Sequence, residues 1–140
     1  MLRGLSTVSF YAEDVTAAAD WYGRLLGIEP YFTREMNGTL AYAEFRVGDY
    51  AHELGIIDRR FAPAGRSGQV GGAIVYWHVD DVPATVARLA EMGASVLEEP
   101  VERGPGFVTA SLVDPFGNIL GVMANQHYLD VLASRPGSPA

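Results

Sequence analysis

The 140-residue chain contains one pattern twice, and this internal repeat constrains the fold more than any other feature. In both Phe10–Val15 and Tyr76–Val82, a strand-like apolar run meets an acidic residue, then valine, and a helical stretch follows. Asp14 and Asp81 stand where a helix N-cap belongs, and a carboxylate there accepts hydrogen bonds from free backbone N–H groups. The repeat predicts a chain made of two copies of one unit.

Each copy is predicted to be a βαβββ unit, the first over about residues 4–60 and the second over about 71–124. Helical spacing of apolar residues predicts helices over 15–26 and 83–92, which end at Gly27 and Gly93. Strands are expected at 4–12, 30–36, 40–47, 50–58, 72–79, 95–102, 107–113 and 118–124. Turns are expected at Asn37-Gly38, Gly48-Asp49 and Asp114–Asn118.

A lone βαβββ unit would bury little apolar surface, so the two units should pack together. The predicted fold class is α+β, with two tandem βαβββ units forming a curved mixed sheet around a cleft. Residues 1–125 are expected to form a single domain, with Ala62–Gly72 as the linker between its units. Residues 126–134 are predicted to form a short helix, and residues 135–140 a tail.

Composition excludes several classes of function. The chain has no cysteine, so thiol nucleophiles, thiolate metal sites and disulfides are excluded. Its net charge of −7 argues against nucleic acid, because binding phosphates requires clustered Lys and Arg. No apolar run is long enough for a transmembrane helix, and residues 1–7 lack the layout of a signal peptide. These features favour a cytoplasmic, soluble protein without nucleic-acid or membrane partners.

Four segments, in order along the chain, resemble the vicinal oxygen chelate superfamily of glyoxalase I, bleomycin-resistance proteins and extradiol dioxygenases. They are Ser9–Pro30, His52–Asp58, His78–Ala94 and Asp114–Val122. The resemblance spans about residues 5–123 and implies the glyoxalase/bleomycin resistance/dioxygenase fold. It leaves the function open, because one fold hosts many chemistries. It also implies a homodimer.

Enzymes of this superfamily typically bind one divalent metal with His or Glu from the first and last strands of each unit. The resemblance places these positions at Thr7, Glu53, Ile74 and Gly121. Of the four, only Glu53 is a good ligand, and catalytic sites usually need about three His or carboxylate ligands. We therefore predict no metal and no cofactor. A divalent metal stays open, because a one-residue shift in register would bring in His52 or His78.

Because side chains alternate along a strand, the same positions predict which residues line the cleft. The candidate ligand-binding residues are Thr7, Ser9, Tyr11, Glu53, Ile74, Tyr76, His78, Gly121 and Met123. With Ala51, Gly55, Ile57 and Ile119, which are expected to face the same way, they form a largely apolar wall with a few polar groups, and such a wall suits a small organic ligand. Glu53 is the candidate catalytic residue. The alternatives are that it pairs with an arginine such as Arg46 or points to water at the mouth of the cleft.

Three functions remain open on the sequence. The first is a metal-free binding protein, similar to the bleomycin-resistance group, that holds an apolar or cationic compound. The second is an enzyme of the same fold, of the lyase, isomerase or dioxygenase type, using Glu53 as a base or as part of a divalent metal site. The third is an interaction module with a vestigial cleft. The poor ligand set favours the first and disfavours metal-dependent catalysis.

Overall fold

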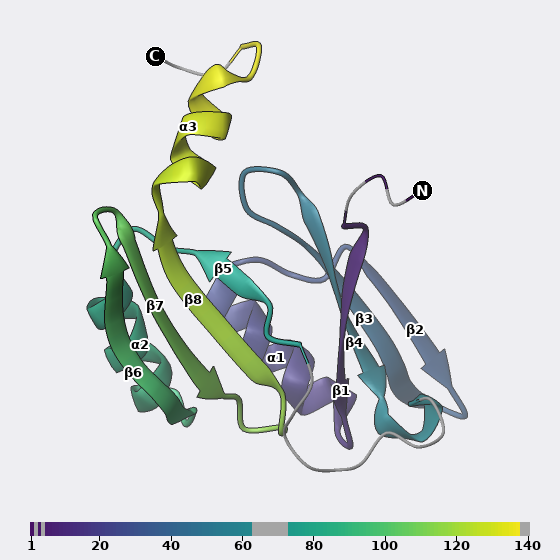
Figure 1. Ribbon diagram of the computed structural model, residues 1–140. Coiled ribbons are helices and arrows are strands. Elements are labelled where there is room, and N and C mark those ends of the chain that lie inside the picture. Colours follow the sequence, from purple (N-terminus) through teal and green to yellow (C-terminus); the bar gives the residue numbers. More distant parts are fainter. Residues whose placement is uncertain (2, 4, 63–72, 138–140) are drawn as a thin grey trace. The chain divides into compact units, whose positions relative to one another are not determined.

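The computed structural model describes residues 1, 3, 5–62 and 73–137, and the chain divides into two compact units, Met1–Gly68 and Gln69–Ala140 (Figure 1). Each unit has a four-stranded mixed sheet, with strand orders β1-β4-β3-β2 and β5-β8-β7-β6. The two orders are equivalent, which confirms the α+β class and the repeat of the βαβββ unit. The predicted linker lies outside the described residues from position 63 onward.

Unit 1 contains one parallel and two antiparallel strand pairs. Its elements are β1 (Thr7–Ala12), α1 (Val15–Leu26), β2 (Phe32–Met36), β3 (Thr39–Val47), β4 (His52–Asp58) and the 3-10 helix η1 (Arg59–Phe61). The turn between β2 and β3 has positive φ at both Asn37 and Gly38, as a two-residue hairpin turn requires.

Helix α1 has the predicted bounds because both of its ends are encoded locally. The Asp14 carboxylate accepts a hydrogen bond from the Ala17 N–H, and Gly27 closes the helix with a φ of 69°. The buried face of α1, including Val15 and Tyr22, packs on one face of the sheet (Figure 1). The opposite face of the sheet therefore carries the other side chains of each strand.

Unit 2 repeats this arrangement, with Asp81 as the N-cap of its first helix. Its elements are β5 (Tyr76–His78), α2 (Val82–Glu91), β6 (Ser95–Gly104), β7 (Phe107–Val113), β8 (Ile119–Asn125) and α3 (Gln126–Ser134). Helix α3 has the bounds expected from the sequence and leaves the end of β8 (Figure 1). Among the described residues, no helix is long and apolar enough to cross a membrane.

Several strand ends differ from the prediction. Strand β1 begins at Thr7 rather than at residue 4, and β5 begins at Tyr76 rather than at residue 72. A residue belongs to a strand only where it pairs, and β5 pairs only with Gly121–Met123, although β8 itself runs from Ile119 to Asn125. The helix η1 was not predicted; its start is capped by Asp58, which accepts a hydrogen bond from the Arg60 N–H.

Candidate functional site

The strand register of unit 1 brings the site candidates of β1 and β4 together on one face. Three pairs lie directly opposite each other: Thr7 and Glu53, Ser9 and Gly55, Tyr11 and Ile57. Apolar residues such as Phe10 and Leu54 alternate with them and are buried on the other face, which α1 covers. We call the face that carries Thr7 and Glu53 the open face of sheet 1.

Glu53 accepts a hydrogen bond from the Thr7 hydroxyl at 3.0 Å. Arg46 lies directly across from Glu53 on β3, yet these two described residues form no ion pair. The Arg46 guanidinium instead lies 4.2 Å from the centre of the Tyr31 ring. The alternative in which Glu53 pairs with Arg46 is therefore wrong, and a threonine hydroxyl is the direct partner of Glu53.

The candidates of unit 2 also form a group. Tyr76 lies opposite Gly121, and His78 lies opposite Met123. Ile74 precedes β5, so its predicted place within this strand is wrong, but its Cγ2 atom lies 2.9 Å from where a Cβ of Gly121 would stand. The backbone N–H of Gly121 donates to the Val75 carbonyl at 3.1 Å.

The chemistry of these side chains does not fit a catalytic divalent metal. Thr7 and Glu53 offer one hydroxyl and one carboxylate, whereas Ile74 and Gly121 offer no side-chain donor. Zinc and related ions are held by about three His, Cys or carboxylate ligands. Within the part of the chain that the structure describes, no three such side chains gather in one place.

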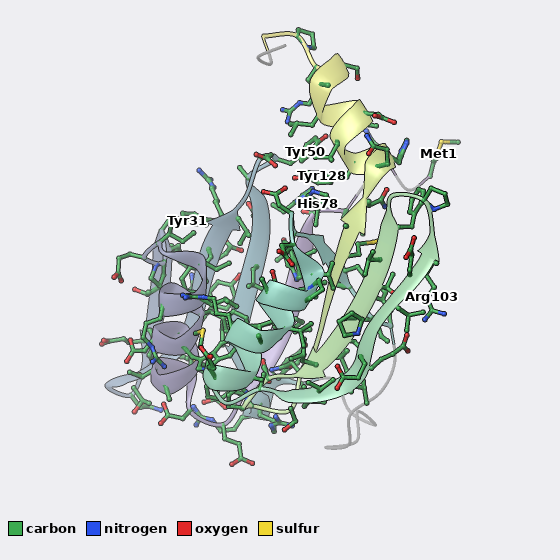
Figure 2. The ribbon with its side chains drawn as sticks, turned by 90° about the vertical axis from the view of Figure 1, so that its left-hand side faces the viewer. Met1, Tyr31, Tyr50, His78, Arg103 and Tyr128 are labelled. Atoms are coloured by element: carbon green, nitrogen blue, oxygen red, sulfur yellow. The ribbon has the colours of Figure 1, made fainter. Side chains whose placement is uncertain are left out.

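The imidazole of His78 is held on both sides. Its Nδ1 accepts a hydrogen bond from the Asn125 N–H at 3.2 Å, and its ring stacks on Tyr128 of α3, with ring centres 4.5 Å apart (Figure 2). Its Nε2 lies 3.6 Å from Asp80 Oδ1, beyond hydrogen-bond distance. Because Nδ1 accepts this hydrogen bond, a ring proton belongs on Nε2, and Nδ1 is already engaged and not free to accept from a ligand.

A buried carboxylate that the sequence did not single out lies at the centre of the open face. Glu44 of β3 is 9% exposed, and it accepts hydrogen bonds from the hydroxyls of Tyr31 and Tyr42, the latter at 2.6 Å. Gly55 on β4 makes room for this arrangement, because a Cβ there would lie 2.9 Å from the Tyr42 hydroxyl oxygen. Two phenols and one carboxylate thus form a hydrogen-bonded polar group on the open face.

Burial raises the pKa of Glu44, and the negative charge of Glu53 raises it further, while Arg46 partly offsets both. Burial and the Glu53 charge also raise the pKa of the Tyr42 hydroxyl. Both shifts favour the protonated forms of these groups. The protonation of Glu44 is therefore coupled to folding.

Replacing this carboxyl should change how stability depends on pH. Because the pKa of Glu44 is raised, the folded state binds more protons than the unfolded state above the ordinary value of 4.5. Stability is greatest below this value and falls as pH rises toward the folded pKa. In urea unfolding from about pH 4 to about pH 8, Glu44→Gln should become more stable relative to the unsubstituted chain as pH rises.

The exposed Glu99 of β6 provides the matched control. Glu99→Gln should leave the shape of the pH profile unchanged. Glu53→Gln removes a charge that raises the pKa of Glu44, so the pKa of Glu44 in the folded chain should be lower. The fall in stability should then end at a lower pH. Parallel profiles for Glu44→Gln and the unsubstituted chain would contradict the assignment.

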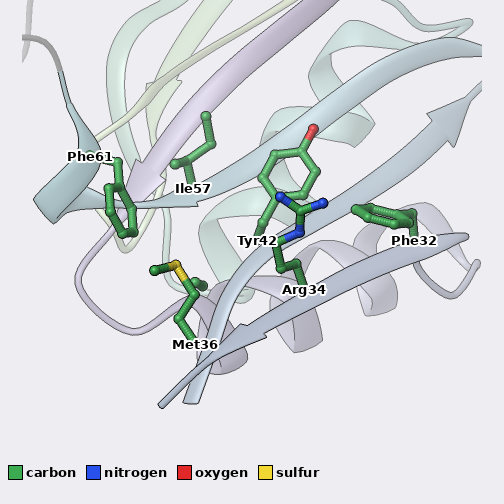
Figure 3. Close-up of a pocket in the computed structure, with 7 residues that line it drawn as sticks. Phe32, Arg34, Met36, Tyr42, Ile57 and Phe61 are labelled. Atoms are coloured by element: carbon green, nitrogen blue, oxygen red, sulfur yellow. The ribbon is translucent and has the colours of Figure 1, made fainter. Parts of the chain in front are cut away.

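A pocket of about 350 Å³ lies in unit 1, beside this polar group (Figure 3). Residues from β2, β3, β4 and η1 line it: Phe32, Arg34, Met36, Ala41, Tyr42, Ile57 and Phe61. Register places Arg34 opposite Tyr42, and Tyr42 opposite Ile57, so these three project from the same face. The pocket is apolar and aromatic, with a single guanidinium.

Sequence reasoning missed most of this pocket. It considered only the strands that carry metal ligands in the superfamily, which correspond to β1, β4, β5 and β8. The alternation of Tyr42, Glu44 and Arg46 along β3 was a usable signal, since it places three polar or aromatic side chains on one face. The inclusion of Phe61 depends on η1, which the sequence did not reveal.

Comparison with known proteins agrees with this architecture. The sequence profile of the Glyoxalase/Bleomycin resistance protein/Dioxygenase superfamily matches residues 4–122. The chain belongs to this superfamily. Among curated proteins, no significant match was found.

Solved structures of the superfamily fold are similar to the chain at low sequence identity. A glyoxalase-related enzyme from Fulvimarina pelagi has a TM-score of 0.68 at 18% identity, covering 89% of this chain and 90% of that protein. TioX from Micromonospora sp. ML1 has a TM-score of 0.64 at 19% identity, covering 87% and 98%. Lactoylglutathione lyase from Agrobacterium tumefaciens has a TM-score of 0.63 at 20% identity, covering 91% and 98%. At such identities the likeness shows the fold alone.

Proposed function

We propose that this superfamily member binds a small organic ligand without a catalytic metal, in the pocket on the open face of sheet 1. The observation that carries the proposal is the pocket itself. Its volume of about 350 Å³ lies at the lower end of the range of small-molecule sites. Phe32 and Phe61 line it and are 42% and 50% exposed, so each retains apolar surface that a ligand could cover.

The donor chemistry supports the metal-free part of the proposal. A Lewis-acid mechanism requires a tightly held divalent ion, and Glu53 is the one strong ligand among the four superfamily positions. The Thr7 hydroxyl occupies one oxygen of this carboxylate. We further propose a homodimer, on the resemblance alone, and a cytoplasmic location, on the composition. Light scattering measures the oligomeric state.

A second candidate is an acid–base enzyme of the same fold. The observation that favours it is that Glu44 and Glu53 share one face, where the negative charge of Glu53 adds to burial in raising the pKa of Glu44. Such a pair can place a proton acceptor and a proton donor beside one ligand. Glu53 is then the base, as the sequence suggested, and Glu44 with its two tyrosines is the proton donor.

Binding is tested with three naphthalenes of equal size and different charge: 2-naphthoate, 2-naphthamide and 2-naphthylmethylammonium. Isothermal titration calorimetry should show that at least one of them binds the unsubstituted chain. Phe61→Ala should weaken its binding about fivefold, because an aromatic contact contributes about 1 kcal/mol beyond area burial. Since Phe61 is half exposed, the substitution should leave folding nearly unchanged.

Phe107→Ala is the matched control, because this phenylalanine is 36% exposed and lies on β7 of unit 2. It should leave naphthalene binding unchanged. The proposal fails if none of the three compounds binds, or if Phe61→Ala and Phe107→Ala behave alike. A stoichiometric divalent metal in protein purified without chelator would contradict the metal-free part.

A further inference from the structure

We infer that the ligand of this pocket is a planar aromatic acid whose anionic group pairs with Arg34. The inference rests on the proposed function and goes beyond it by naming the ligand's charge. It differs from the sequence-based expectation of an apolar or cationic compound, which followed the net charge of the whole chain.

Arg34 has no ionic partner among the described residues. Its guanidinium carbon lies 5.9 Å from the centre of the Phe32 ring. Two other arginines of unit 1 are engaged: Arg60 forms an ion pair with Asp58 at 2.9 Å, and Arg46 lies over the Tyr31 ring. The Arg34 guanidinium therefore keeps its N–H donors available at the wall of the pocket.

The two carboxylates of the open face are already engaged elsewhere. Glu44 accepts the hydroxyls of Tyr31 and Tyr42, and Glu53 accepts the hydroxyl of Thr7. None of the described residues that line the pocket is acidic. The charge of the pocket wall is thus positive, although the chain as a whole carries −7.

The shape of the donor and of the walls indicates the ligand class. A guanidinium is planar and presents paired N–H donors that match the two oxygens of a carboxylate. Phe32, Tyr42 and Phe61 supply aromatic surfaces, which favour a flat conjugated body. Figure 3 shows Arg34 beside Tyr42 and Phe32, with Phe61 farther along the pocket, so one ligand could contact both aromatic surface and the guanidinium.

The same three naphthalenes test the inference. The unsubstituted chain should bind 2-naphthoate about tenfold more tightly than 2-naphthamide, because a hydrogen-bonded charge pair contributes about 1.4 kcal/mol or more. Binding of 2-naphthylmethylammonium should be the weakest. Arg34→Gln should weaken 2-naphthoate about tenfold and leave 2-naphthamide unchanged, which a merely structural role for Arg34 would not do.

The matched control is Arg24→Gln, which removes one exposed positive charge from α1, on the other side of sheet 1. It should leave the binding of all three compounds unchanged, so a general effect of net charge would be recognised. Three results would overturn the inference while the proposed function stands. They are equal affinities for the acid and the amide, tighter binding of the ammonium compound, and an unchanged affinity of Arg34→Gln for 2-naphthoate. Absence of binding by all three would overturn both.

Discussion

Gly121→Ala is expected to destabilise the chain by about 3 kcal/mol, which lowers Tm by about 10 °C for a chain of this size. A Cβ at this position would lie 2.7 Å from the Val75 carbonyl oxygen, 2.8 Å from Tyr76 Cδ1 and 2.9 Å from Ile74 Cγ2. The first of these atoms is backbone, so relief requires β5 to move away from β8. Strand β5 has only three residues, so this movement would disturb all of its pairs with β8.

Gly104→Ala is the control for this prediction, and thermal unfolding is the measurement. Gly104 ends β6 of the same unit, and a Cβ there would meet no atom within 4 Å, so its substitution should change stability by less than about 0.5 kcal/mol. Adding Ile74→Ala should not rescue Gly121→Ala, because the closest atom is a carbonyl oxygen. Equal Tm values for Gly121→Ala and Gly104→Ala would show that the backbones do not approach so closely.

This crowding also bears on the superfamily's metal position. Any side chain at position 121 would meet the backbone of Val75, so Gly121→His would disturb β5 before it could supply a ligand. The missing donor at this position thus accompanies close packing of two strands. Both the backbone packing and the side chains of unit 2 therefore depart from the superfamily's metal-binding pattern.

The sequence predicted the helices well because their signals are local. The start of α1 depends on Asp14 and its end on Gly27, and both residues act within one helical turn. The faces of the strands were also predictable, since alternation follows from the geometry of one strand alone. These features need no knowledge of the partner strand.

Strand ends and the pocket could not be predicted, because they depend on residues distant in the sequence. The ends of β5 depend on where it pairs with β8, about forty-five residues later. The Glu44 group requires the register of β3 against β4, which places Gly55 beneath the Tyr42 ring. The role of Arg34 follows only from the structure, in which Glu44 and Glu53 accept hydrogen bonds from other side chains and do not pair with it.

The turn between β7 and β8 is the second place where one substitution should have a large effect. Asp114 is 3% exposed, and its Oδ1 accepts hydrogen bonds from the backbone N–H groups of Phe116 and Asn118 at 2.9 and 2.8 Å. Its Oδ2 accepts from the Asn118 side-chain amide at 3.0 Å. The turn aligns β8 against β7, and so places Gly121 and Met123 beside β5.

Asp114→Ala should therefore cost about 3 kcal/mol in urea unfolding, because it leaves several donors near a buried site without an acceptor. Asp114→Asn should cost less, because its side-chain oxygen can still accept from the backbone N–H groups. Its amide NH2, however, would face the NH2 of Asn118, and two donors cannot hydrogen-bond to each other. Asp130→Ala is the control: this exposed aspartate of α3 accepts from Gln126, and its loss should cost less than about 0.5 kcal/mol. Equal losses of stability in Asp114→Ala and Asp130→Ala would contradict this role of the carboxylate. Strand pairing alone would then align β8.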